Sequence, residues 1–148
     1  MKTVKLFFPG EPGSKQSMRI GRTKTGKVIS FQDKKVKERE STIRIEANAQ
    51  LYHQNLGPMP FMERARVLKL HFVFTPLKNI RKADLKRIME GELLPKTTKP
   101  DLTDNLKKGL FDALQGILYS NDSIIFEEAN TGKYYGKAPG IYLEMEGE

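Results

Sequence analysis

The chain has 148 residues, 38% of them hydrophobic. This length suits a single domain with one hydrophobic core and leaves little room for a second domain. It contains no cysteine, which excludes disulfides, thiolate metal sites and cysteine nucleophiles, so any metal must be bound by oxygen or by the two histidines. No apolar run approaches the ~20 residues of a membrane span, and we expect a cytoplasmic protein, one domain over residues 1–148, without membrane contact.

The charge is unevenly distributed along the chain. The formal net charge is +8; residues 1–50 hold 12 Lys/Arg against 5 Asp/Glu, residues 51–100 hold 10 against 4, and residues 101–148 hold 4 against 9. Positive charge on this scale suits the neutralisation of nucleic-acid phosphates, with an affinity that falls as salt rises. A basic surface that only keeps the protein soluble is the alternative, and composition alone does not separate the two.

The first predicted elements are a strand and a basic loop. Residues 4–8 are apolar and two Pro-Gly pairs follow, which predicts a strand that ends at a loop. Residues 14–27, SKQSMRIGRTKTGK, fold poorly alone and suit a flexible arm along a phosphate backbone, with a disordered tip without function as the alternative. The predicted DNA contacts of this arm are Lys15, Arg19, Arg22, Lys24 and Lys27.

A short strand and a long helix are expected next. Residues 28–31 have the composition of a strand, and residues 33–55 contain no Gly or Pro, which predicts a long, mostly polar helix. Ile43, Ala47 and Leu51 give this helix a narrow apolar stripe. Its basic side chains would lie over the exposed surface, where an ordinary solvated helix is the simplest interpretation: Lys34, Lys35, Lys37, Arg39 and Arg44.

Residues 67–75, VLKLHFVFT, are the clearest strand. Alternation predicts one face that packs in the core, made of Leu68, Leu70, Phe72 and Phe74, and an opposite face made of Val67, Lys69, His71, Val73 and Thr75. A histidine on a strand is more often a surface or packed residue than a ligand, so we assign no role to His71, and none to His53.

The remaining elements complete a small α+β domain. Residues 80–90 read as a short basic helix, and residues 92–99 as a loop that leads to Asp101. Residues 124–128 and 140–145 are predicted closing strands. The expected fold is a small mixed β-sheet packed by helices.

Four of the six aspartates fall within residues 101–122. Thr103 precedes a run with helical apolar spacing and is predicted to cap a helix that begins at about Asp104. Asp104, Lys108 and Asp112 follow one another at i, i+4 and i+8 and gather on one side of this helix. The apolar residues that gather on the opposite side are Leu106, Leu110, Ala113, Leu114 and Ile117.

Two interpretations of these charges are open. A surface ion-pair ladder, worth a few tenths of a kcal/mol per pair, would by itself explain Asp104, Lys108 and Asp112. That interpretation leaves out Asp101 just before the helix and Asp122 just after it, from where a chain that turns back brings further carboxylates near Asp104. Carboxylates that converge need Mg²⁺ or Mn²⁺ to offset their repulsion.

Such a site suits the hydrolysis of a phosphodiester. A cation held by aspartate oxygens polarises the phosphate and lowers the pKa of a bound water. Lys108 would neutralise charge that develops on the phosphorus centre or orient the water. No protein nucleophile is required, in agreement with the absence of cysteine.

The stretch 99–125 resembles the signature of the RusA family of Holliday-junction resolvases. The shared features are KPD, DNL, a lysine two residues after that leucine, DAL, QG, and ND followed by SII. PGEPGSKQSMR also resembles the N-terminal proline and basic segment of that family. The similarity covers most of the chain, but only residues 99–125 are specific.

The resemblance implies a catalytic set of three aspartates and a lysine, here Asp101, Asp104, Asp122 and Lys108, with the aspartates as ligands of Mg²⁺, for which Mn²⁺ would substitute. It further implies supporting roles for Asp112 and Asn121 and a DNA contact from Lys99. In two places the sequence departs from the family pattern. Leu102-Thr103 stands between the first two aspartates, where the family usually has one residue, and Asn121 replaces the first of two adjacent aspartates.

The resemblance also implies a RusA-like fold, a homodimer, and the cleavage of branched DNA, in particular four-way junctions, during recombination and repair. Two active sites related by a two-fold axis suit paired cuts in opposing strands. Two alternatives are a nuclease of the same fold acting on other branched, flapped or RNA-containing substrates, and a DNA-binding protein that kept the fold and lost cleavage.

Overall fold

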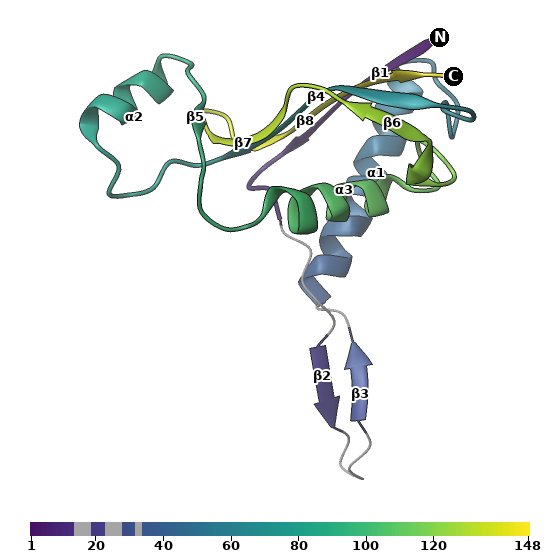
Figure 1. The fold of residues 1–148 in the computed structure, drawn as a ribbon, viewed down its shortest axis with the longest axis horizontal. Coiled ribbons are helices and arrows are strands. Elements are labelled where there is room, and N and C mark those ends of the chain that lie inside the picture. The colour runs from purple at the N-terminus through teal and green to yellow at the C-terminus, as the bar shows by residue number, and fades with distance from the viewer. Residues whose placement is uncertain (14–18, 23–27, 32–33) are drawn as a thin grey trace.

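The computed structural model describes residues 1–13, 19–22, 28–31 and 34–148 (Figure 1). In chain order the elements are β1 (Lys2–Pro9), β2 (Arg19–Arg22), β3 (Val28–Phe31), α1 (Lys34–His53), β4 (Ala65–Phe74), α2 (Lys82–Met89), β5 (Leu94–Pro95), the π-helical turn η1 (Leu102–Lys107), α3 (Lys108–Leu114), the 3-10 turn η2 (Asp122–Ile124), β6 (Ile125–Glu128), β7 (Thr131–Tyr135) and β8 (Gly140–Gly147). None of the described helices is long and apolar enough to cross a membrane.

The main sheet has six strands and is mixed, which confirms the predicted α+β class. The order is β1-β8-β4-β7-β5, and β6 also pairs with β4. β8 runs antiparallel to both β1 and β4, whereas β6 and β7 run parallel to β4 and pair with successive parts of it. β2 and β3 form a separate antiparallel pair, which Figure 1 draws apart from the main sheet.

The core lies between one face of this sheet and the helices α1 and α3 (Figure 1). Alternate residues of β1 and β8 enter it, namely Val4, Leu6, Phe8, Ile141, Leu143 and Met145. Ala47 and Leu51 of α1 are buried as predicted, and Ile43 packs against the cluster. Burial of this stripe stabilises the helix, whose exposed surface is mostly polar apart from Ile45 and Tyr52.

The face prediction for β4 is wrong at its start. Val67 is fully buried, while Leu68 is only half-buried. The pairing of β4 with β8 shifts register between Val67 and Lys69, and such a bulge reverses which residues point inward. Beyond the bulge the predicted alternation holds, because Leu70 and Phe72 are fully buried.

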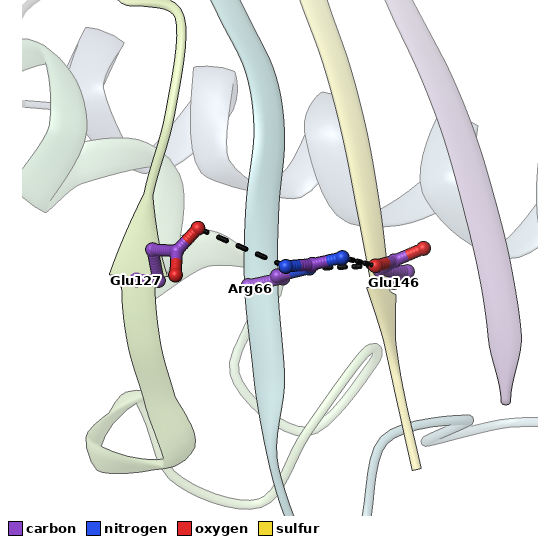
Figure 2. A network of polar contacts seen from close by, with 3 residues as sticks. All are labelled: Arg66, Glu127 and Glu146. Atoms are coloured by element: carbon purple, nitrogen blue, oxygen red, sulfur yellow. Dashed lines mark hydrogen bonds and ion pairs between the residues drawn. The ribbon is translucent and has the colours of Figure 1, made fainter.

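The opposite face of the sheet carries a polar network that ties three strands together (Figure 2). Arg66 of β4 donates from Nε to Glu146 Oε1 of β8 at 2.6 Å, and its Nη1 lies 3.9 Å from Glu127 Oε1 of β6. One guanidinium thus links both neighbours of the central strand.

Two further expectations need correction. Arg44 is exposed as expected, but it is not simply solvated, because its Nη1 donates to the Ala113 and Gln115 carbonyls at 2.9 and 2.8 Å. The stretch 92–99 is not all loop, since Leu94–Pro95 pairs with β7. β7 itself was not predicted.

Candidate active site

The site region begins with a π-helical turn. The backbone N–H of Leu106 donates to the Asp101 carbonyl at 3.1 Å, a bond across five residues. The prediction that Thr103 caps a helix starting at about Asp104 is wrong, because the helix begins at Leu102 and Asp101 holds the N-cap position. The Asp101 side chain makes no capping hydrogen bond within the described chain and is exposed.

This wider turn explains the unusual spacing of the first two aspartates. A π turn closes over one more residue than an α turn, and it commonly marks functional sites. Leu102 and Thr103 stand between Asp101 and Asp104 where the resemblance implies a single residue. Both intervening residues, Leu102 and Thr103, lie inside the π-helical turn.

The helix is divided into an apolar and a polar side, as predicted. Leu106, Leu110, Ala113 and Leu114 are buried, together with Phe111, and Ile117 is buried just beyond the helix. Asp104 and Lys108 are exposed, and Asp112 is half-buried. The acidic and basic side chains of the predicted site thus point away from the core.

Two long-range contacts fix the C-terminal end of α3. The guanidinium of Arg44 satisfies carbonyls that the helix end leaves without intrahelical partners. The Tyr119 hydroxyl donates to the Phe111 carbonyl at 2.8 Å, and the Tyr119 side chain is fully buried. These contacts hold α3 against α1 and the turn that follows.

Asn121 and Asp122 lie on the turn after α3. The Asn121 side-chain oxygen accepts from the backbone N–H of Ser123 at 2.8 Å and so caps η2, whose first residue is Asp122. Asn121 therefore shapes the turn that presents Asp122. The Asp122 side chain is exposed.

Tyr119 is buried within electrostatic range of two of the four aspartates. Burial raises the pKa of the Tyr119 hydroxyl, and the negative charges of Asp122 and, to a smaller extent, Asp112 raise it further. Both carboxylates therefore act on the same phenol from different elements. The fold brings the turn after α3 back alongside the last turn of that helix.

The donor chemistry of the predicted metal site fits a hard cation, since Asp101, Asp104 and Asp122 offer exposed carboxylate oxygens. Across residues 1–13, 19–22, 28–31 and 34–148, however, no three acidic or histidine side chains are grouped so as to hold one ion. The metal site stays a prediction.

The two adjacent lysines of the motif have different surroundings. Lys107 Nζ lies 2.6 Å from Glu128 Oε2 of β6; Lys107 is half-buried and Glu128 is exposed. Lys108 is exposed and forms no ion pair with a carboxylate in the described part of the chain. The predicted catalytic lysine is thus the one whose charge is not neutralised by a partner.

The loop before Asp101 is held by residues that the sequence did not single out. Lys133 of β7 donates to the carbonyls of Thr98 and Pro100 at 2.5 and 2.7 Å. Lys96 donates to Thr98 Oγ1 and to the Tyr135 hydroxyl. The stretch 131–135 has no clear alternation, because all five of its residues are half-buried, so the sequence offered no signal for β7.

The predicted DNA contacts are only partly described. Lys99 is exposed and lies two residues before Asp101 in the sequence. Arg19 and Arg22 are the first and last residues of β2. Lys15, Lys24 and Lys27 lie outside the described residues.

The comparison with known families agrees with the motif. Residues 9–146 of the 148 match the family model described as Endodeoxyribonuclease RusA. No curated protein matched the chain. The match includes η1, α3, η2 and the strands of the main sheet from β4 to β8, while β1 lies outside it except for Pro9. The chain therefore belongs to the RusA family of endodeoxyribonucleases, whose members act on Holliday junctions.

Proposed function

We propose that this protein is a Mg²⁺-dependent endonuclease that resolves four-way DNA junctions by paired hydrolysis of phosphodiester bonds. The observation that supports this most is the placement of Asp101, Asp104 and Lys108 on the exposed side of η1 and α3, with Asp122 on the turn that folds back. The motif that resembles the family signature thus lies on one connected, solvent-facing unit.

Asp101, Asp104 and Asp122 would bind the cation, with Mn²⁺ as a substitute for Mg²⁺. All three side chains are exposed, so their oxygens can reach a cation from solvent and can change rotamer without disturbing the core. When bound, the ion would supply Lewis acidity and a more acidic water. Asp112 and Asn121 would support the site from beside it, Asn121 through the turn that it caps.

Lys108 would act on the phosphate. Its ammonium is exposed and has no carboxylate partner within the described residues, so it can lie against charge that builds up on the non-bridging oxygens. The arm that carries Arg19 and Arg22, together with Lys99, would bind the DNA backbone by charge and shape, with little sequence readout. We also propose a homodimer, since two cuts in opposing strands suit two sites related by a two-fold axis.

A DNA-binding protein of the same fold that has lost cleavage is the second candidate. It is favoured by one observation, that no three acidic side chains of the described chain are grouped around a common point. A nuclease on other branched substrates shares the same site and differs only in the DNA that it prefers.

Cleavage of a synthetic four-way junction tests the proposal. With Mg²⁺ we expect symmetric cuts from the wild type, whereas Asp104→Asn and Asp122→Asn should bind the junction and cut at least about 100-fold more slowly. Asp84→Asn is the matched control, because Asp84 lies on α2 outside the site and the substitution changes the charge equally. A wild type that binds junctions but never cuts with Mg²⁺ or Mn²⁺ would establish the non-catalytic candidate instead.

A further inference from the structure

A cluster of hydrogen-bond donors lies immediately upstream of Asp101. Lys96 Nζ lies 2.9 Å from Thr98 Oγ1 and 3.2 Å from the Tyr135 hydroxyl oxygen, and these two oxygens are 3.5 Å apart. Pairing of Leu94–Pro95 with β7 brings Lys96 alongside Tyr135, because the backbone N–H of Lys96 donates to the Lys133 carbonyl at 3.1 Å. Three side chains from two segments thus converge at one point.

The cluster is positively charged and has no carboxylate counter-ion among the described residues. Lys96 Nζ lies 5.1 Å from the ring centroid of Phe74 and 4.8 Å from that of Tyr135. Its hydrogen-bond acceptors are neutral hydroxyls, and Lys133 is bonded to backbone carbonyls. Neither lysine forms an ion pair with a carboxylate anywhere in the part of the chain that the structure describes.

The pKa of Tyr135 is affected by the same positive charge. The hydrogen bond from Thr98 and the bond and charge of Lys96 lower the pKa of the Tyr135 hydroxyl, with a smaller contribution from Lys133, against the opposing effect of partial burial. No acidic side chain is among the groups that act on it. An environment that favours a phenolate also favours other oxygen anions.

We infer that Lys96, Thr98 and Tyr135 form a phosphate-binding subsite that holds a backbone phosphate of the DNA strand next to the phosphodiester being cut. An ammonium with one N–H donor left over, beside two hydroxyls, offers the charge and the hydrogen bonds that a phosphate accepts. The inference rests on the proposed function, because it assigns the subsite to the same DNA.

The position of the cluster relative to Asp101 supports a neighbouring phosphate. Lys133 holds the carbonyls of Thr98 and Pro100, and Pro100 directly precedes Asp101. The short segment from Thr98 to Asp101 is therefore fixed at two points, so that a strand held at Lys96 is also placed against η1. A role limited to packing, with Lys96 only bridging β5 and β7, is the competing explanation.

The salt dependence of binding separates these explanations. We would measure the affinity for a fluorescent four-way junction in EDTA, which prevents cleavage, at several salt concentrations. Lys96→Met should make the slope of log K against log salt shallower by about 0.9, the value for one phosphate contact. Lys2→Met removes an equal charge from the start of β1 and should leave the slope unchanged.

Two further variants keep the test decisive. Lys96→Arg retains the charge and should retain the wild-type slope, whereas Tyr135→Phe should weaken binding by about threefold to tenfold without changing the slope by a full contact. A Lys96→Met protein that melts at a lower temperature but keeps the wild-type slope would overturn the subsite and leave the packing role.

Failure of the proposed function is distinguishable from failure of the subsite. If the wild type binds no DNA, the proposed function fails, and inorganic phosphate then becomes the probe. A saturable shift of the Thr98 backbone amide resonance on phosphate addition, absent in Lys96→Met, would support an anion site independent of DNA. No saturable shift in that case would overturn the subsite as well.

Discussion

Lys107 Nζ lies 2.6 Å from Glu128 Oε2 and joins the π-helical turn to β6, whereas the next residue, Lys108, faces solvent. The two lysines have the same chemistry and adjacent places in the sequence. They differ only in the direction in which the helix displays them. This makes them a natural pair for separating stability from catalysis.

Substitution of each lysine by methionine should have opposite consequences. Lys107→Met leaves Glu128 without its partner and should lower the free energy of unfolding by on the order of 1 kcal/mol. Lys108→Met should leave that free energy unchanged and lower kcat for junction cleavage by about 100-fold. Urea denaturation and single-turnover cleavage measure the two effects. Equal losses of stability in both variants would contradict the assignment of Lys108 to the site.

Lys133 is expected to act through the loop that precedes Asp101. Lys133→Met removes the donor to the Thr98 and Pro100 carbonyls, so Asp101 should be held less firmly. Misplacement of this kind should lower kcat by about tenfold or more while KM changes little. Lys133→Arg should recover part of the rate, and Lys137→Met, in the exposed loop after β7, serves as the control. A change in KM alone would assign Lys133 to binding.

Tyr119 should make the fold sensitive to alkali. Its pKa is raised by burial, while an unfolded tyrosine releases its proton near pH 10. The stabilisation is therefore complete below about pH 10 and is lost above it, by up to about 1.4 kcal/mol per pH unit. Tyr119→Phe should cost about 1 kcal/mol at pH 7, from the lost bond to the Phe111 carbonyl, and this cost should shrink above pH 10. Thermal unfolding from pH 7 to 11 tests it, and a constant cost over that range would contradict it.

Deletion of Thr103 should convert the π turn into an α turn. The deletion leaves one residue between the first two aspartates, and the α turn needs one residue fewer. We expect a folded variant that cleaves junctions within about tenfold of the wild-type rate, since η1 is the only segment that must rewind. Circular dichroism and the junction assay check both points. A folded variant that binds but does not cut would show that the extra residue is part of the site.

Much of the fold follows from simple patterns. β1 and α1 were predicted because an apolar run ended by Pro-Gly pairs, and a stretch without Gly or Pro, are local properties of the chain. The error at Val67 and Leu68 has a different origin, because a bulge depends on how β8 pairs with β4. β7 was missed since its side chains are uniformly half-buried and give no alternation.

The two sides of the helix that carries the candidate site were predictable from the sequence, whereas its hydrogen-bond register was not. The polar side of the helix follows from the spacing of Asp104 and Lys108, and the buried side from the leucines. The π turn was not predictable in this way, because apolar spacing does not report hydrogen-bond register. Contacts such as Lys133 to Pro100 or Arg44 to Ala113 depend on residues far apart in the sequence that only the folded sheet and helices bring together.

The π turn also determines where a length difference belongs when RusA-like sequences are aligned. A gap placed in the loop before Asp101 would pair this aspartate with the wrong residue of a shorter relative and leave the motif without its first acid. The alignment gap in a shorter relative belongs between the positions of Asp101 and Asp104, because the π-helical turn contains the additional residue of this chain. Relatives with the longer spacing should then carry the same four positions in the same order as relatives with the shorter one.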